Sequence, residues 1–401
     1  MQVGSQISDD LTVTSCDDFH PVDSIVELIT SDHPNRIFRH DPTRETPMPP
    51  WRPRHGVDIF GDGQASEIDG WKFDGLPHWK WTAKPHTREV STFALDGGIL
   101  LPGSMATISG DRQLIYQSVE LSEYWGGIDQ MEPLISKKDG KLRFDDRVLD
   151  DVPEIAISVS GALYNNYGHF LLDGLPIVYL LVNAVRRPLV IACPQITDWQ
   201  LRVLELLNLD ENLRILDRPT RFMTLIGSSC LSHHVARPTR YARAVFDALR
   251  FVVAFAPDAP EKLFIMRAEQ GSRVMNNADE LKERLIKRGY AAITPENYSI
   301  VEQIQMFSRA KVIVGATGAG MANIGFAPPG VKVVDVMAEC RPDQWVRNLC
   351  FVLGHRWHGY VHRVDAIRGG FIGATYYPLY DFDFNLPLDD FEQALAVIES
   401  A

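Results

Sequence analysis

Residues 312–335 read VIVGATGAGMANIGFAPPGVKVVD, and this stretch decides the fold of the C-terminal half of the chain. An apolar, β-branched run ends in a glycine-rich turn, a run of small residues follows, and a second β-branched run ends at Asp335. The pattern predicts a strand, a short helix and a following strand. Because free N–H groups and the helix dipole meet at such a turn, it favours a bound phosphate. We therefore expect the chain to bind a nucleotide or another phosphorylated ligand.

Strands and helices are expected to alternate from residue 155 onward. The expected strands cover residues 155–159, 189–193, 213–216, 223–227, 262–266, 290–294, 311–314, 331–336 and 357–364. The expected helices cover residues 168–184, 196–208, 240–255, 278–288, 299–309, 319–325, 343–353 and 388–399. Such alternation predicts parallel sheets with covering helices. A break near residues 236–241 separates two blocks, so the predicted fold class is α/β, with two Rossmann-like halves facing each other across a cleft.

The first 90 residues differ in composition from the rest of the chain. They hold nine of the 25 prolines and four of the eight tryptophans, and their hydrophobic periodicity is weak. We expect an irregular arm, residues 1–90, whose tryptophans anchor it to the body or line a groove. The two Rossmann-like halves are expected at 91–238, starting with hairpin strands, and at 239–385. The remaining segment, 386–401, is expected to be a helix that packs back across the domains.

Composition narrows the class of protein. A net charge of −12 with interspersed acids and bases disfavours nucleic acid as a partner. The sequence has no apolar stretch near the ~18–20 residues of a transmembrane helix, and its N-terminus lacks the pattern of a signal peptide. The five cysteines are scattered without a Cys-x-x-Cys pair. We therefore expect a cytoplasmic protein with reduced cysteines.

The segment 164–176, YNNYGHFLLDGLP, carries a candidate catalytic pair. If a helix begins near Gly168, His169 and Asp173 stand four residues apart on one face. A histidine and a carboxylate so placed can share a substrate hydroxyl, one as the base and the other orienting it. The alternative is a helix cap with a satisfied pair in the core. The apolar neighbours favour a paired, functional role, because buried polar groups require a partner.

Arginines and a helix start provide further candidates. Arg267 and Arg273 follow an expected strand that ends at Met266, and parallel sheets bind ligands at the carboxyl ends of their strands. Guanidinium groups suit phosphate oxygens, although solvated loop arginines are an equal alternative. Ser299 and Glu302 match a capping box, which by itself accounts for Glu302.

The glycine turn also permits a different reading. GATGAG at 315–320 is close to the fingerprint of extended short-chain dehydrogenases, and Asp335 lies where a ribose-binding acid belongs. That fingerprint normally opens its domain, whereas only 81 residues follow Gly320, and the chain has no Tyr-x-x-x-Lys. An oxidoreductase using NAD(P) is therefore an alternative that the context disfavours.

Metal sites are poorly supported by the sequence. The histidines at 233, 234, 355, 358 and 362 lack an accompanying Cys or Glu pattern. Asp381 and Asp383 form an Asp-x-Asp pair of the kind that holds Mn²⁺ or Mg²⁺ in some glycosyltransferases. The pair lies in an aromatic-rich segment without a preceding βαβ unit, so we expect no metal and no cofactor.

Four segments, in order and with matching spacing, resemble glycosyltransferase family 61. The first is YGHFLLDGLP at 167–176, which matches the family's aromatic-Gly-His-aromatic-Leu-x-Asp-x-Leu-Pro pattern. The second family pattern is a strand that ends in Arg and is followed by a second Arg and an Asn. The third is a helix that begins with Glu-Gln, and the fourth is Gly-x-His-Gly-Ala-Gly-x-x-Asn. They stand here as Arg267, Arg273 and Asn276, as Glu302 and Gln303, and as GATGAGMAN at 315–323. Three positions depart from the family pattern: Thr317 replaces the usual His, Asn277 a common Glu, and Asp335 the usual Glu.

The resemblance implies a GT-B fold and an inverting hexosyl- or pentosyltransferase that needs no metal. Residues 91–238 would bind the acceptor and 239–385 a nucleotide-sugar donor, with UDP as the expected nucleotide. The diphosphate would contact Arg267, Arg273 and the N–H groups of Gly318, Ala319 and Gly320. Further donor contacts are expected from Asn276, Glu302, Thr317, Asn323 and Asp335, or from Glu339 in place of Asp335.

The expected base for the acceptor hydroxyl is Asp173, with His169 orienting that hydroxyl or contacting the donor. The expected setting is bacterial capsule, lipopolysaccharide or exopolysaccharide synthesis, with a saccharide or lipid-linked saccharide as acceptor and contact with the membrane surface to reach it. A non-catalytic relative that binds nucleotide or saccharide is a further alternative, because the departures at Thr317 and Asn277 permit such drift.

Overall fold

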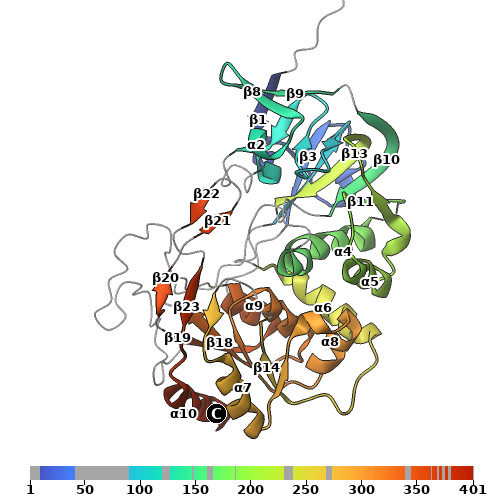
Figure 1. Ribbon diagram of the computed structural model, residues 1–401. Coiled ribbons are helices and arrows are strands. Elements are labelled where there is room, and N and C mark those ends of the chain that lie inside the picture. Colours follow the sequence, from blue (N-terminus) through green and yellow to red (C-terminus); the bar gives the residue numbers. More distant parts are fainter. Residues whose placement is uncertain are drawn as a thin grey trace, which may run out of the picture.

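The computed structural model describes residues 10–40, 90–119, 127–146, 149–159, 166–185, 187–229, 238–267, 273–338, 345–362, 364–367, 370–372, 375–377 and 381–400. The chain forms a mixed α/β structure. A large mixed sheet lies in the upper part of Figure 1 and a smaller parallel sheet in the lower part. No helix within these described ranges is long and apolar enough to span a bilayer.

The C-terminal sheet has five parallel strands in the order β16-β14-β17-β18-β19. They are β14 (Lys262–Ile265), β16 (Ala291–Ile293), β17 (Val312–Ala316), β18 (Lys332–Ala338) and β19 (Arg356–His362). The first strand along the chain, β14, lies between β16 and β17, so the connections diverge there. The carboxyl ends of β14 and β17 therefore border a topological switch point, where open parallel sheets bind ligands.

Alternate side chains of these strands face two helical layers, as the strand period of two requires. Phe264 and Val314 pack with α7 and α10, whereas their neighbours Leu263 and Ile313 pack with α8, η7 and α9. The helices are α7 (Ala278–Lys287), α8 (Ile300–Phe307), the 3₁₀ helix η7 (Ala319–Phe326), α9 (Trp345–Leu353) and α10 (Leu388–Ser400). A short 3₁₀ helix, η6 (Pro295–Asn297), precedes α8.

The N-terminal sheet combines a parallel part with antiparallel additions. Its parallel strands are β10 (Asp150–Ser158), β11 (Val190–Cys193), β12 (Leu213–Ile215) and β13 (Thr220–Ser228), in the order β12-β11-β10-β13. The antiparallel partners of β13 are β4 (Ser91–Asp96) and β5 (Ile99–Leu100). Beyond β5 the sheet continues through β6 (Thr107–Ile108), β7 (Gln113–Ile115), β1 (Asp10–Thr14), β9 (Lys141–Phe144) and β8 (Ile135–Lys138). The expected Rossmann-like character thus holds only for the four parallel strands.

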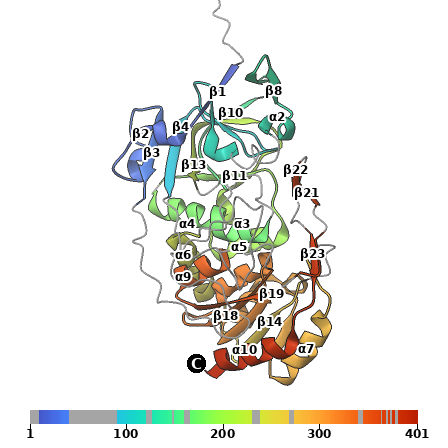
Figure 2. The same ribbon diagram turned by 90° about the vertical axis from the view of Figure 1, so that its left-hand side faces the viewer.

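The helices between residues 167 and 252 lie between the two sheets. They are α3 (Tyr167–His169), the π-helical turn η3 (Phe170–Gly174), α4 (Leu175–Ala184), α5 (Asp198–Leu206) and α6 (Arg240–Val252). Figure 2 shows them between the upper sheet and the layer of α9. Further short helices are η1 (Cys16–Asp18), η2 (Val26–Leu28), α2 (Ile128–Met131) and η4 (Asp210–Asn212). The strands and helices expected between residues 155 and 399 are all present, with ends shifted by a few residues.

The expectation of one irregular arm over residues 1–90 is wrong for residues 10–40. There, β2 (His20–Pro21) and β3 (Asn35–Arg39) extend the large sheet, with β3 antiparallel to β4. Arg36, only 1% exposed, bonds both carboxylate oxygens of Asp96 at 2.8 Å. The strand is short and its pairing partner lies more than 50 residues away, so local periodicity does not reveal it. Trp51, Trp71, Trp79 and Trp81 lie outside the described residues.

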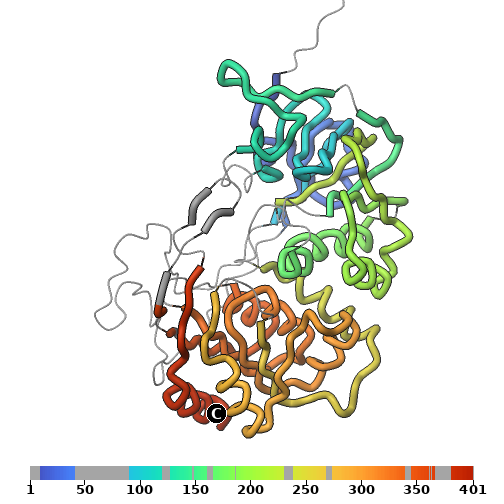
Figure 3. Tube along the Cα trace, viewed as in Figure 1, coloured from blue at the N-terminus to red at the C-terminus, as the bar shows by residue number. Residues whose placement is uncertain are grey.

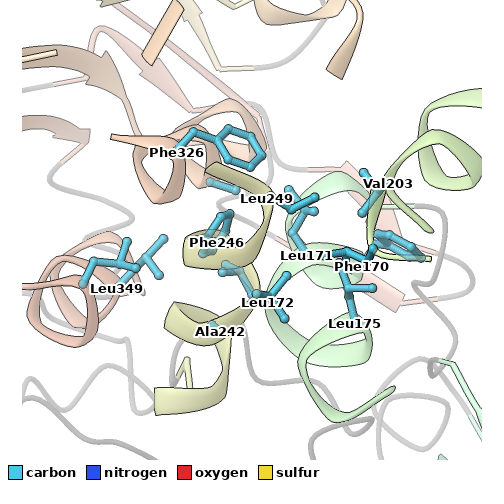
Figure 4. Close-up of a cluster of buried hydrophobic side chains, with 14 of the residues drawn as sticks. Phe170, Leu171, Leu172, Leu175, Val203, Ala242, Phe246, Leu249, Phe326 and Leu349 are labelled. Carbon is cyan, nitrogen blue, oxygen red and sulfur yellow. The ribbon is translucent and has the colours of Figure 1, made fainter. Parts of the chain in front are cut away.

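One hydrophobic core runs through both halves. Side chains of η3 and α4, of α6, and of η7 and α9 form a single buried cluster, and Figure 4 shows Phe246 and Leu249 of α6 between Leu171 and Phe326. The rings of Phe246 and Phe326 meet edge to face, 5.2 Å apart. A Cβ at Gly325 would lie 2.4 Å from the Phe246 ring, so this contact requires glycine. The two halves are therefore packed together at α6 rather than joined by a linker alone.

The C-terminal helix does not cross between the halves as expected. Phe391, Leu395 and Ile398 of α10 pack on the C-terminal sheet beside α7. The helix lies at the lower end of the molecule, remote from the N-terminal sheet (Figures 1 and 3). Preceding it, β23 (Phe382–Phe384) joins β15 (Val274–Met275) and β20 (Ala366–Ile367) in a small sheet, and β21 (Gly370–Ile372) pairs with β22 (Thr375–Tyr377).

Candidate active site

A pocket lies at the carboxyl ends of the C-terminal strands. The expected donor residues Arg267, Arg273 and Thr317 all line it. The remaining lining residues, which the sequence patterns did not single out as lining one pocket, are Ala316, Val336, Ala338, His362, Phe382 and Phe384. The ring of His362 stacks on Phe384, with centroids 3.7 Å apart. The pocket therefore joins cationic side chains to an aromatic wall at the end of the sheet where parallel folds bind ligands.

Arg267 lies against the glycine turn. A Cβ added to Gly318 would lie 3.7 Å from Arg267 Nε, so the guanidinium stem passes directly over the turn. Ala319 and Gly320 then open η7, whose first N–H groups have no acceptor within the helix. At Gly315 a Cβ would lie 2.5 Å from Met321 Sδ, which explains the glycine there. The structure thus places Arg267 and the start of η7 together at the switch point.

Arg273 is held by the C-terminal segment. Its φ of 56° lies in the left-handed region that non-glycine residues rarely adopt, and its N–H donates to Asp381 Oδ1 at 3.1 Å. The N–H of Asn276 donates to Phe384 O at 2.8 Å, and the Asn276 side chain is exposed. Asn277 both donates to Leu386 O and accepts from Leu386 N. Asp381, considered above as half of a metal-binding pair, serves here to hold the loop that carries Arg273.

Thr317 and Asp335, two of the three departures from the family pattern, are bonded to each other. Thr317 Oγ1 donates to Asp335 Oδ1 at 2.6 Å, and Trp357 Nε1 donates to Asp335 Oδ2 at 3.2 Å. The Asp335 side chain is 0% exposed. Both carboxylate oxygens are therefore engaged inside the protein, and a ribose hydroxyl cannot reach them in this conformation. The other acid considered for that role, Glu339, lies outside the described residues.

Glu302 and Asn323 have structural contacts. Glu302 accepts hydrogen bonds from the backbone N and Oγ of Ser299 at 2.8 and 2.7 Å, so the predicted capping box is confirmed. These bonds, the side-chain one first, lower the pKa of the Glu302 carboxyl against a small opposing effect of burial. Asn323 is 0% exposed and accepts a hydrogen bond from Tyr167. Neither side chain faces the pocket of Arg267 and Arg273.

His169 and Asp173 form the pair expected from their spacing. His169 Nδ1 lies 2.6 Å from Asp173 Oδ2, and the two side chains are 13% and 12% exposed. Asn166 caps the helix start by accepting from the N–H groups of Gly168 and His169. Residues 170–174 then form a π-helical turn, a feature often found at functional sites. With Nδ1 directed at the carboxylate, the imidazole presents Nε2 on its other side.

The candidate catalytic pair, His169 and Asp173, and the glycine turn belong to adjacent elements. The helical turn Tyr167–His169 lies against η7, although it comes from the N-terminal half of the chain. No three His, Cys, Asp or Glu side chains in the described part of the chain gather as metal ligands would. The arrangement thus offers guanidinium groups and a helix start for a phosphorylated ligand, with a His–carboxylate pair nearby.

These features define an α/β protein whose candidate site combines two arginines, the start of a 3₁₀ helix and a His–carboxylate pair. Residues 167–334 match the family model described as Glycosyltransferase 61, which confirms the family that the four motifs indicated. The match supports, at the level of the family, a glycosyltransferase. The match begins at Tyr167 and spans the pair of His169 and Asp173, both arginines and the glycine turn. A comparison with curated proteins gave no match.

Proposed function

We propose that this protein transfers a sugar from a nucleoside diphosphate donor to a saccharide acceptor, with inversion and without an obligatory metal. The observation that carries the proposal is the pocket at the carboxyl ends of β17, β18 and β19, which Arg267 and Arg273 both line, with Arg267 against the turn that opens η7. Two guanidinium groups and a helix N-terminus provide positive charge for a diphosphate. UDP is the first candidate nucleotide, on the basis of the family resemblance.

The two arginines would take over the part that a divalent cation plays in other transferases. When the bond between the anomeric carbon and the diphosphate oxygen breaks, negative charge develops on the leaving group. Arg267 and Arg273 are placed to stabilise that charge. The room now left in the pocket is about 20 Å³, little more than one water molecule occupies. The donor therefore binds only if the arginine side chains first move aside to make room. Their guanidinium groups would then contact the phosphates.

Asp173 and His169 would activate the acceptor. In the proposed step, the acceptor hydroxyl gives its proton to Asp173 while its oxygen bonds to the anomeric carbon, and the nucleoside diphosphate departs from the opposite face. The bond at 2.6 Å between His169 Nδ1 and Asp173 Oδ2 keeps the two groups in register. His169 Nε2 is the second possible base, with Asp173 orienting the ring. Comparing Asp173→Asn with His169→Gln separates these assignments, because the variant that removes the base loses more turnover.

The position of the glycine turn disfavours an NAD-dependent enzyme. The turn follows β17, which is the third strand along the chain in its sheet, whereas a dinucleotide fingerprint follows the first. The acid expected to hold a ribose, Asp335, is buried and bonded by Thr317 and Trp357. Both observations favour a nucleotide held mainly through its phosphates.

The proposed architecture is of GT-B type, with the acceptor bound to the N-terminal half and the donor to the C-terminal half. The proposed setting is the cytoplasmic side of a bacterial membrane, in the synthesis of surface polysaccharides. The family resemblance supports this setting. A lipid-linked acceptor would bring the protein to the membrane surface.

The test is a thermal-shift series with UDP, GDP, CMP, dTDP, ADP and NAD⁺. A ligand that binds only the native state raises Tm. We expect one nucleoside diphosphate to stabilise the wild type and to lose this effect in Arg267→Ala/Arg273→Ala. Arg221→Ala, which removes a half-exposed arginine paired with Asp151 on the N-terminal sheet, is the matched control and should retain the shift.

Two results would contradict the proposal. Stabilisation by NAD⁺ alone would favour the oxidoreductase. The second contradicting result is stabilisation by a nucleotide without turnover. In that case no UDP would be released from UDP-glucose, UDP-galactose, UDP-xylose or UDP-N-acetylglucosamine, and no matching diphosphate from other nucleotide sugars. This result would favour a non-catalytic binding relative.

A further inference from the structure

Tyr167 occupies the junction between the catalytic pair and the donor side of the molecule. It begins the helical turn that carries His169, two residues later, and its hydroxyl reaches across to the C-terminal half. The hydroxyl oxygen lies 2.5 Å from Asn323 Oδ1 in η7 and 3.1 Å from Gln303 Oε1 in α8. One phenol group therefore connects elements that the chain separates by more than 130 residues.

Both acceptors of the Tyr167 hydroxyl are buried. Asn323 is 0% exposed and Gln303 is 6% exposed. Gln303 is itself held in place, because its Nε2 donates to Tyr298 O at 2.9 Å. Burial first, and then the charge of Glu296, raise the pKa of Tyr167 well above its usual range, against a small opposing effect of the Asn323 bond. The hydroxyl therefore stays protonated, and its single hydrogen is shared between the two amide oxygens, with the shorter contact to Asn323. Removing the hydroxyl leaves both buried oxygens without this donor.

The Tyr167 ring is fixed independently of its hydroxyl. It packs on Trp199 of α5, with centroids 5.1 Å apart, and the same indole meets Phe170 edge to face at 5.2 Å. A Tyr→Phe substitution therefore keeps the ring contacts and removes only the connection to Asn323 and Gln303. This separation makes the role of the hydroxyl testable.

We infer that Tyr167 is a positioning residue, whose hydroxyl fixes the start of the His169–Asp173 helix against η7 and α8. It touches neither Arg267 nor Arg273 in the donor pocket, so it acts through the placement of the catalytic pair relative to the glycine turn. The inference rests on the proposed function, because it assigns the catalytic pair to the transfer step. A displacement of about 1 Å at such a pair is enough to lower turnover about a hundredfold.

The experiment compares Tyr167→Phe with Tyr179→Phe. Tyr179 lies on α4, in the same helical run and packed against the same core, and it provides a matched loss of one hydroxyl. For each variant we would measure Tm, the Kd of UDP by calorimetry, and kcat and KM for UDP release from the nucleotide sugar that the wild type cleaves best. For Tyr167→Phe we expect kcat to fall at least about tenfold while the Kd of UDP stays within about twofold. Tyr179→Phe should match the wild type in all four quantities.

A second comparison tests the route by which Tyr167 acts. If Tyr167 works only through the catalytic pair, Tyr167→Phe/Asp173→Asn should be no slower than Asp173→Asn alone. A general loosening of the fold would instead lower both rates by the same factor. Additive losses, or a Tyr167→Phe variant whose kcat stays within twofold of the wild type, would overturn the inference.

Failure of the proposed function gives a different result. If Asp173→Asn and His169→Gln both keep full turnover, the catalytic assignment is lost. In that case the double variant Tyr167→Phe/Asn323→Ala still tests the contact, because the two losses in Tm should be less than additive only if the bond exists. Additive losses in Tm would overturn the positioning role as well.

Discussion

At the scale of single residues, the most informative feature is the contact between Thr317 and Asp335. Each differs from the residue usual in the family, and each is shorter than its counterpart. The hydroxyl and the carboxylate meet at 2.6 Å, and Trp357 bonds the other carboxylate oxygen. Thr317 thus serves to satisfy a buried acid behind the pocket. The two departures from the family pattern thus meet in one hydrogen-bonded pair.

Removing the Thr317 hydroxyl should destabilise the fold. Thr317→Val preserves shape but leaves Asp335 Oδ1 without this donor, so we expect the free energy of unfolding to fall by about 1–3 kcal/mol. Thr317→Ser keeps the hydroxyl and should stay within about 0.5–1 kcal/mol of the wild type. Urea denaturation of the three proteins provides the measurement. Equal unfolding free energies for the two variants would show that the bond carries no net stability.

At the scale of elements, the C-terminal helix α10 depends on an ionic contact at its end. Glu399 accepts hydrogen bonds from Lys262 and Tyr290, each at 2.9 Å, and also bonds Arg288 at 2.5 Å. Burial, the largest single effect on this carboxyl, opposes ionisation, but the three bonds outweigh it and lower the pKa of Glu399. The helix end is therefore held to the amino-terminal edge of the C-terminal sheet by a carboxylate that must remain charged.

This contact gives stability a defined pH dependence. Because the folded-state pKa lies below the unfolded value of about 4.3, the contribution of Glu399 is fully present above that value and is lost as pH falls through the folded pKa. We expect Glu399→Gln to lower the free energy of unfolding by about 1–3 kcal/mol at pH 7. The difference from the wild type should shrink below pH ~4. Denaturation curves at several pH values check this, and a difference that does not change with pH would contradict it.

At the scale of the whole molecule, α6 makes the two halves a single cooperative unit. Its residues Phe246 and Leu249 lie in one continuous core with η3 on one side and η7 on the other (Figure 4). Arg250 adds a hydrogen bond from its guanidinium to Ala327 O at 2.7 Å. A shared apolar core couples the catalytic pair to the glycine turn, because neither half can shift without disturbing the packing around α6.

Overpacking this junction should destabilise both halves together. In Gly325→Ala the new methyl group would lie 2.4 Å from the Phe246 ring, so we expect a loss of about 1–3 kcal/mol. Calorimetry should show one unfolding transition at a lower temperature, and Phe246→Leu in the same chain should recover part of the loss. Two separate transitions in the wild type would show instead that the halves unfold independently.

The sequence alone determined the elements of the C-terminal half and the residue types of the site. Hydrophobic periodicity is a local signal, so the strands of the two parallel arrays and their covering helices from residue 155 onward were predicted close to their observed bounds. The short strands β15, β20, β21, β22 and β23 were not predicted, because each spans only two or three residues. The capping box at Ser299 and the pairing of His169 with Asp173 were also predictable, because residues three or four apart on a helix are neighbours whatever the tertiary fold. The placement of Arg267 and Arg273 near one edge of the sheet was predicted for a different reason, namely that parallel strands place their carboxyl ends along one edge.

Only the tertiary structure decided which polar groups face the pocket and how the halves are joined. Asp335 and Asn323 had the right spacing for ligand contacts, but their burial depends on Trp357 and Tyr167, which are remote in sequence. The pairing of β3 with β4 and the contact of Tyr167 with Gln303 likewise depend on partners more than 50 residues away. Such long-range contacts leave no periodic trace in the chain, because they follow from the packing of whole elements around a common core.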